Sequence, residues 1–368
     1  MAVRIDIAGN MLEWAITRAG YSLGQYLENS QDVAAWVRGE KKPTIKQLEA
    51  FAKGLHVPFG YLFLQKPPVE KSPIPFFRGG ANSGDLDLNT YDTVLDLQRR
   101  QEWLVDYLSE NDFEKKSFVG SMRGCNSATD LVSKVRKLLR LEPTWAFSFH
   151  SNEKAVNHMT ELFEELGIVV TFNGVVGNNT RRPIDVNQCR GFALVDDMAP
   201  FIFVNSADSK TAQLFTLIHE FVHLLLGVSS GYGGNNGFEG DSNERLCDKA
   251  SANFLVPEDA LRANWTNVEQ TAKKFRVSGL VVARRAKDVG LITGAQFKDY
   301  YAGYLARPVQ DKARRSGGDF NLVARKRIGI TFAVYVHNAV RTSQLSQVEA
   351  YRLTGLYGKT YTNFMSKL

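Results

Sequence analysis

Apolar residues in the first 64 positions follow helical spacing and are separated by capping and turn residues. They recur three or four positions apart over residues 12–19, and Gly20 follows where a helix C-terminus favours a positive φ. Two capping-box patterns, Ser22 to Gln25 and Thr44 to Gln47, predict the starts of further helices. The proline-rich segment 66–75 then reads as a linker. These features predict a helical N-terminal unit.

The hydrophobic period changes twice in the rest of the chain. Helical spacing is found first over residues 90–110, 126–140 and 152–166. Short runs rich in β-branched and aromatic residues follow at 168–172, 191–195 and 201–204. Helical spacing returns over 209–227, 243–256, 267–275 and 278–289. This order predicts an α+β, mostly helical protein with a small β-sheet.

The composition narrows the class of protein. No apolar run approaches the roughly 18 residues that a membrane span needs, and the N-terminus lacks a signal-peptide pattern. Cys125, Cys189 and Cys247 are widely spaced, which disfavours both a disulfide framework and a cysteine-only zinc site. We therefore expect a soluble cytoplasmic protein with no membrane partner.

The positive charge is concentrated near the C-terminus. Residues 301–368 hold 11 Lys or Arg against 3 Asp or Glu, whereas residues 1–70 hold 8 against 7. A basic segment can attract a polyanion, although a solvated basic face explains the same count. Both interpretations stay open for the C-terminal region.

The motif His219-Glu220-Phe-Val-His223 lies on one of the predicted helices. Two histidines four residues apart lie on one helical face and can share a Zn²⁺ ion, while Glu220 sits beside them as a candidate general base. Apolar residues surround the motif, so its helix should lie within a core. Burying two histidines and a glutamate there is costly unless they have binding partners. The motif predicts a catalytic zinc site.

A third ligand should come from the helix that follows the glycine-rich loop 227–240. We assign Glu244, and Asp248 lies one turn further on the same face as a candidate hydrogen-bond acceptor for a ligand histidine. The alternative for both residues is an ordinary solvated helix carboxylate. Cys247 is expected to be a small buried residue rather than a ligand.

The strand expected at residues 191–197 precedes the motif helix. If its edge were exposed, an extended peptide could pair with it beside the metal by β-augmentation. An interior strand fits the same sequence, and both interpretations stay open.

The chain resembles the long form of the ImmA/IrrE family of zinc metallopeptidases, which carries an N-terminal XRE-type helix-turn-helix. The resemblance is carried by the following stretches: Trp36 to Thr44, Pro58 to Leu64, Arg190 to Asp197, Ala199 to Asn205, Phe215 to His223, Glu244 to Asp248, Phe254 to Pro257, and Val277 to Ile292. It implies that His219, His223 and Glu244 bind zinc and that Glu220 is the catalytic base. Family members cleave or control helix-turn-helix repressors, and some long forms are thought to act as antitoxins or regulators. Asp248 departs from the asparagine common at its position.

A DNA-binding role depends on the N-terminal unit. A recognition helix over residues 31–38 would offer only Gln31 and Arg38 to bases, with Lys41 and Lys42 near phosphates. The balanced charge of residues 1–70 gives little nonspecific attraction to DNA. A degenerate helix-turn-helix that docks a protein or forms a homodimer fits equally well.

The sequence thus predicts five parts. They are an XRE-like helix-turn-helix domain (1–68), a helical connector (69–150), a zincin-like metallopeptidase core (151–262), a helix-turn-helix-like support (263–305) and a basic helical C-terminal region (306–368). The leading hypothesis is a zinc-dependent endopeptidase of narrow specificity that acts on a helix-turn-helix repressor or similar regulatory protein. The alternative is a DNA-binding regulator or antitoxin that uses the metallopeptidase fold as a scaffold or sensor.

Overall fold

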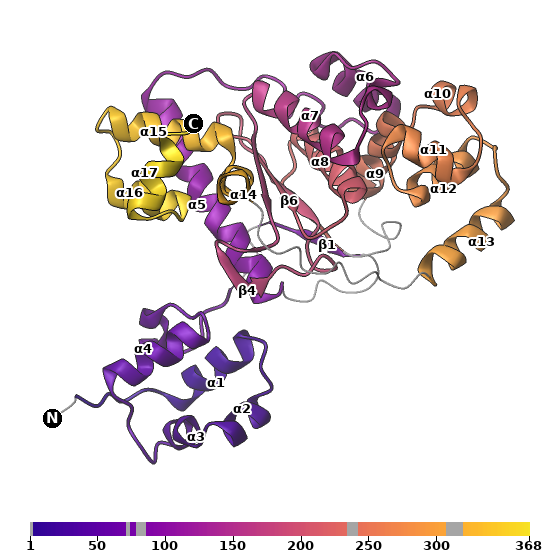
Figure 1. Cartoon of the computed structure of the whole chain (residues 1–368). Coiled ribbons are helices and arrows are strands. Elements are labelled where there is room, and N and C mark those ends of the chain that lie inside the picture. The colour runs from indigo at the N-terminus through magenta and orange to yellow at the C-terminus, as the bar shows by residue number, and fades with distance from the viewer. Residues whose placement is uncertain (1–2, 71–73, 79–85, 234–241, 307–318) are drawn as a thin grey trace. The chain divides into compact units, whose positions relative to one another are not determined.

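The computed structural model describes residues 3–70, 74–78, 86–233, 242–306 and 319–368 (Figure 1). Half of the glycine-rich loop 227–240, part of the linker 66–75 and the basic residues of segment 307–318 lie outside these ranges. The chain divides into one unit formed by residues 1–72 and 85–91 and another formed by 73–84 and 92–368. We describe each unit by itself.

The N-terminal unit is built from short helices around one apolar core. These are α1 (Gly9–Arg18), α2 (Leu23–Asn29), α3 (Gln31–Val37), α4 (Ile45–Gly54) and the 3₁₀ helix η1 (Phe59–Phe63). Trp36 of α3 packs edge-on against Phe51 of α4, with ring centroids 6.2 Å apart. The capping box at Thr44 is present. The helix predicted after Ser22 begins at Leu23, but the Ser22 side chain makes no capping hydrogen bond.

The larger unit contains a five-stranded mixed sheet in the order β1-β7-β5-β6-β2. Its strands are β1 (Phe76–Arg78), β2 (Val169–Asn173), β5 (Gly191–Leu194), β6 (Phe201–Asn205) and β7 (Ser230–Gly233). The β5 strand pairs antiparallel with both β6 and β7, while β2 is parallel to β6 and β1 is parallel to β7. A separate hairpin joins β3 (Val175–Val176) to β4 (Asn179–Pro183).

Helices cover both faces of this sheet. Successive strand residues point to opposite sides, and here the residues on both sides are apolar and need to be buried. On one face, Val170, Ala193 and Ile202 share a core with α6 (Ala128–Leu139), α7 (Asn152–Glu165), α8 (Lys210–Leu226) and α9 (Ser242–Leu255). On the other face, Val169, Phe192, Leu194, Phe201 and Phe203 share a core with α5 (Leu88–Glu110), α14 (Phe320–Ile328), α15 (Ile330–Arg341), α16 (Gln347–Thr354) and α17 (Gly358–Met365). Figure 1 shows α5 and the yellow C-terminal helices gathered on one side of the strands. The connector and C-terminal segments therefore contribute to the same layered structure as the motif helix.

The remaining helices extend the first core. They are η2 (Trp145–Ser148), α10 (Glu258–Ala263), α11 (Val268–Phe275), α12 (Gly279–Asp288) and α13 (Gly294–Leu305). Phe275 and Val282 bring α11 and α12 into contact with the core that contains α8. The protein is mostly helical with a small mixed sheet, as an α+β class implies. Within the described ranges, no helix combines the length and apolar composition needed to cross a bilayer.

Candidate metal centre

The helix α8 carries the His-Glu-x-x-His motif through the middle of the first core. The Ser209 side chain accepts a hydrogen bond from the Ala212 N–H at the start of the helix, and Gly227 ends it with φ 72°. Every residue of α8 from Thr216 to Leu226 is buried. Packing on all sides fixes the rotation of the helix, so the direction of the motif side chains is set by the core.

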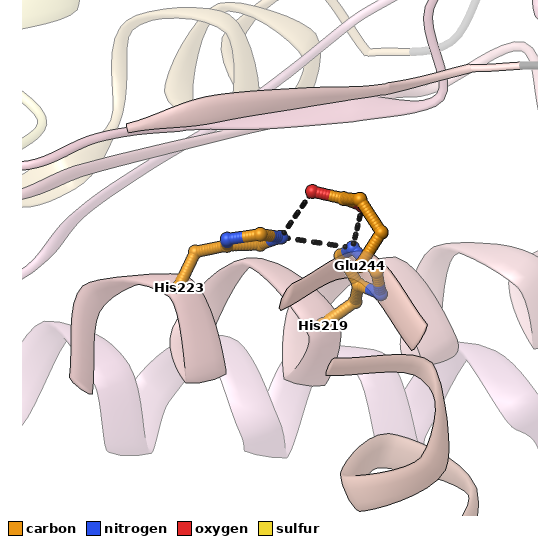
Figure 2. Close-up of side chains that lie close together, drawn as sticks. All are labelled: His219, His223 and Glu244. Carbon is orange, nitrogen blue, oxygen red and sulfur yellow. Dashed lines mark hydrogen bonds and ion pairs between the residues drawn. The ribbon is translucent and has the colours of Figure 1, made fainter. Parts of the chain in front are cut away.

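Two histidines of α8 meet a glutamate of α9 at one point (Figure 2). The Nε2 atom of His219 lies 3.1 Å from Oε2 of Glu244, and Nε2 of His223 lies 3.1 Å from Oε1 of the same carboxylate. The two Nε2 atoms are themselves 3.1 Å apart. Among the described residues, this is the group of three whose donor atoms could hold one metal ion.

The spacing of these atoms fits a tetrahedral zinc site. Ligands about 2.0–2.1 Å from a zinc ion at tetrahedral angles lie roughly 3.3 Å from one another, close to the distances seen here. Two neutral imidazoles that aim lone pairs at each other repel, and a cation between them relieves that repulsion. The donor set of two imidazoles and one carboxylate also matches the ligands of catalytic zinc, which leave a fourth position open. The residues therefore fit a zinc ion.

Asp248 lies on the opposite side of His219 from Glu244. Its Oδ1 atom is 3.1 Å from Nδ1 of His219, and Glu244 and Asp248 are one turn apart on α9. A carboxylate at Nδ1 keeps Nε2 directed at the metal position and makes it a stronger donor. The structure thus brings Asp248 to the place that the spacing predicted.

Glu220 lies beside the histidines and is completely buried. Among the described residues, neither of its carboxylate oxygens has a hydrogen-bond partner. Burial raises the pKa of Glu220 well above its ordinary value, with Glu244 and Asp248 adding to the effect and His219 opposing it. A buried carboxylate without partners is costly, so this side chain calls for a proton or a water molecule next to it.

The charges of the ligand group favour a bound cation. Burial acts to raise the pKa of Glu244, but its contacts with His219 and His223 outweigh this effect and lower it to about 2. Burial lowers the pKa of His223, which keeps that imidazole in the neutral form that binds metals. The position of Glu244 in the first turn of α9 adds the favourable field of the helix N-terminus.

Sequence reasoning missed a contact between the sheet and Glu220. A Cβ atom on Gly191 would lie 2.4 Å from Thr216 Cγ2, 2.7 Å from the Phe203 carbonyl oxygen and 3.3 Å from Glu220 Oε1. The strand β5 therefore approaches the motif helix as closely as a glycine allows. The signal in the sequence was a glycine at the start of an apolar strand, but nothing local indicates which helix it faces.

The strand expected to offer an edge to a peptide is interior. β5 is hydrogen-bonded to β6 on one side and to β7 on the other, so the edge interpretation was wrong and the interior alternative is confirmed. β1 and β2 lie at the ends of the sheet. The outer side of β2 faces Gly329, where a Cβ atom would lie 3.0 Å from the Val170 carbonyl oxygen.

The candidate DNA contacts lie in the N-terminal unit and are engaged with carboxylates. Arg38 pairs with Glu40 at 2.7 Å. Lys41 pairs with Asp32 at 2.7 Å, and Lys42 pairs with Asp6 at 2.8 Å. Gln31 is exposed as the first residue of α3. A cation already paired with a carboxylate has less attraction for a phosphate, so these pairs weaken the case for DNA reading.

Comparison with known proteins gives a match for the region that contains the motif. A search of curated proteins gave no match. Residues 163–287, which run from the end of α7 to α12, match the model of the peptidase M78 family described as the IrrE N-terminal-like domain. This span contains α8, α9 and all five side chains described at the candidate metal centre, and the match supports the resemblance to ImmA/IrrE metallopeptidases over that region.

Proposed function

We propose that this protein is a zinc-dependent endopeptidase of narrow specificity that cleaves or controls a regulatory protein. One observation carries the proposal: three donor atoms from His219, His223 and Glu244 converge, and the Glu220 carboxylate lies beside them without a hydrogen-bond partner among the described residues. A purely structural zinc site would have four protein ligands and no use for an unpaired base. The peptidase-family match of residues 163–287 supports the same conclusion.

The residues would divide the work as follows. His219, His223 and Glu244 hold the ion, and Asp248 orients His219 through Nδ1. Zinc held there supplies Lewis acidity and lowers the pKa of a water molecule to about 7. Glu220 would hold the proton released by a water molecule that attacks the peptide carbonyl and would pass it to the leaving amine. Burial, which raises the pKa of Glu220, suits it for both steps.

Burial of the centre supports narrow specificity. His219 and Glu220 are fully buried, and Glu244 is 6% exposed. Because these side chains are buried, the parts of the protein that pack over them must move before a peptide can reach them. An unselective protease activity is therefore not expected. We propose that a specific partner protein provides the binding energy for that movement.

The test combines zinc content with a search for cleavage. Purified wild-type protein should hold about one zinc ion, measured by mass spectrometry. New N-termini should be detected by terminal labelling when the protein is added to a lysate of cells that encode it. Glu220→Gln should keep the zinc and lower cleavage on the order of 10²–10⁴-fold, since it removes only the base. Glu165→Gln, which changes an exposed carboxylate of α7, is the matched control and should cleave as the wild type does.

Two outcomes would overturn the proposal. Cleavage that continues unchanged in Glu220→Gln would mean that the assigned base is wrong. A wild-type protein that holds no zinc after metal loading would remove the basis of the mechanism.

The N-terminal unit is proposed to dock a protein partner or a second copy of the chain rather than to read an operator. The pairing of Arg38, Lys41 and Lys42 with carboxylates supports this choice. A mobility-shift assay on the promoter of the protein's own gene separates the alternatives. No shift is expected even at about 50 mM salt, where phosphate contacts are strongest. A sequence-specific shift would instead favour the DNA-binding regulator.

A further inference from the structure

A small polar cavity lies on the face of the sheet opposite to the metal centre. Its volume is about 20 Å³, and it is lined by residues of α5, β2, β6, the turn of the β3-β4 hairpin and α14. The lining residues are Thr93, Asp96, Leu97, Arg100, Thr171, Asn173, Gly177, Phe203 and Arg327. The surrounding core is apolar, so placing two arginine side chains at one cavity is costly unless their charges and N–H groups have partners.

Arg100 of α5 is the deeper of the two arginines. It is 7% exposed, and its Nη2 atom binds Oδ2 of Asp96 at 2.7 Å. Its Nε–H has no acceptor among the described residues. A buried guanidinium N–H without a partner carries a penalty that a bound acceptor would remove.

Arg327 of α14 faces the same cavity and is half-buried. Its Nη1 donates to Oδ1 of Asn178 at 3.1 Å, and no carboxylate is found to pair with it in the described part of the chain. Asp96 is the cavity's acidic residue, and it also binds Arg99 at 2.5 Å. The cavity lining therefore holds two guanidinium groups, of Arg100 and Arg327, and one carboxylate, which leaves an excess of positive charge.

The other polar groups on the β2 side are already engaged. Thr171 donates its hydroxyl hydrogen to the Ile202 carbonyl at 3.3 Å. Asn173 donates to the Gly177 carbonyl at 2.7 Å and accepts from the Val175 N–H at 3.2 Å. The unused groups identified around the cavity are thus guanidinium donors, so the cavity favours an acceptor with negative charge.

We propose that this cavity binds a phosphate group, with one oxygen inside the cavity on Arg100 Nε and the others at its mouth on Arg327. The volume of about 20 Å³ holds about one water-sized atom, so the whole group cannot enter. A guanidinium group matches the geometry and charge of phosphate oxygens. Such a ligand would join α14 to α5 and to the sheet, independently of the proposed peptidase activity.

Calorimetric titration with inorganic phosphate at constant ionic strength tests the proposal on the zinc-loaded full chain. Wild-type protein should bind one phosphate per chain at this site, and Arg327→Gln should weaken that binding at least tenfold. Arg325→Gln, which removes the same charge from the same helix but lies outside the cavity lining, should change it less than twofold. Arg100→Gln should abolish binding, and its circular dichroism spectrum checks that it still folds.

A crystal grown in phosphate supplies the second measurement, which does not depend on variants. Tetrahedral density next to Arg100 Nε and the Arg327 guanidinium would support the proposal. A water molecule alone in the cavity would overturn it, as would equal loss of phosphate affinity in Arg325→Gln and Arg327→Gln. Chloride that competes as well as phosphate at equal concentration would also overturn it, because the site would then be a halide site.

Discussion

At the scale of single residues, the metal centre depends on side chains held from two directions. His219 contacts Glu244 through Nε2 and Asp248 through Nδ1, each at 3.1 Å. His223 contacts only Glu244 and His219 through Nε2, and its Nδ1 has no partner among the described residues. The two histidines are therefore not equivalent, because only His219 has its ring orientation fixed by a carboxylate.

Asp248→Ala should lower zinc affinity without removing a ligand. Loss of the carboxylate at Nδ1 frees the His219 ring to rotate and weakens Nε2 as a donor, so we expect affinity to fall about 10- to 100-fold. Competition with a coloured chelator measures this. Asp248→Asn, which keeps a hydrogen-bond acceptor, should lose less, and Asp259→Asn in α10 should lose nothing. Equal affinity in the wild type and Asp248→Ala would show that the contact does not orient the ligand.

The positions of the candidate ligands could be predicted from the sequence because they repeat at helical spacing within single helices. His219 and His223, and likewise Glu244 and Asp248, are four residues apart, so each pair shares a face. The approach of Gly191 to Glu220 was not accessible, since it depends on which face of β5 meets α8. The polar cavity was missed for the same reason, because Arg100 and Arg327 come from helices far apart in the sequence.

At the scale of elements, the helices were predicted better than the pairing of the strands. Apolar periodicity located α8 and α9 because a long amphipathic or buried helix repeats its signal over several turns. The interior place of β5 could not be read from its own residues. The interior position of β5 depends on β7, a four-residue strand with the sequence Ser-Gly-Tyr-Gly and almost no hydrophobic pattern.

The contact between α7 and α15 should make stability depend on pH. Burial raises the pKa of Glu164 to about 7, with the Ile330 N–H at the start of α15 opposing the shift and Glu161 adding to it. Below about pH 4.5, Glu164 is protonated in both folded and unfolded chains. As pH rises towards 7, the unfolded chain ionises first and the folded state loses stability, by at most about 3 kcal/mol.

Glu164→Gln should therefore be more stable than the wild type at pH 8, with the difference shrinking towards pH 4.5. Urea denaturation across this range measures the difference, and Glu165→Gln, an exposed neighbour, controls for the charge change. A difference that stays constant with pH would mean that Glu164 is not the titrating group.

At the scale of the whole molecule, the two faces of one sheet are covered by different helices. The first face holds the metal centre, and the second is covered by α5 and by α14 to α17. The excess of basic residues over 301–368 gives no sign of this packing, which depends on the apolar residues of the same helices. Burial of Phe332, Val336 and Phe364 makes this region part of the folded core.

A chain ending at residue 306 should not fold stably. It would expose Phe192, Phe201 and Phe203, which the C-terminal helices cover, and such an apolar surface leads to aggregation. A chain beginning at residue 74 should keep a cooperative thermal transition and its zinc, since the N-terminal residues form a separate unit. Circular dichroism and zinc analysis of both proteins measure this. A soluble, zinc-binding 1–306 fragment would contradict the expectation.

The close approach of Gly191 to α8 also limits how the protein can diverge. A side chain at this position would meet a methyl group of Thr216 and the carbonyl oxygen of Phe203. A smaller residue at 216 would relieve the first clash, but no replacement elsewhere removes a main-chain oxygen. Substitution at 191 would have to shift the strand itself, which lies against Glu220, so a change at this position would also move the Glu220 carboxylate.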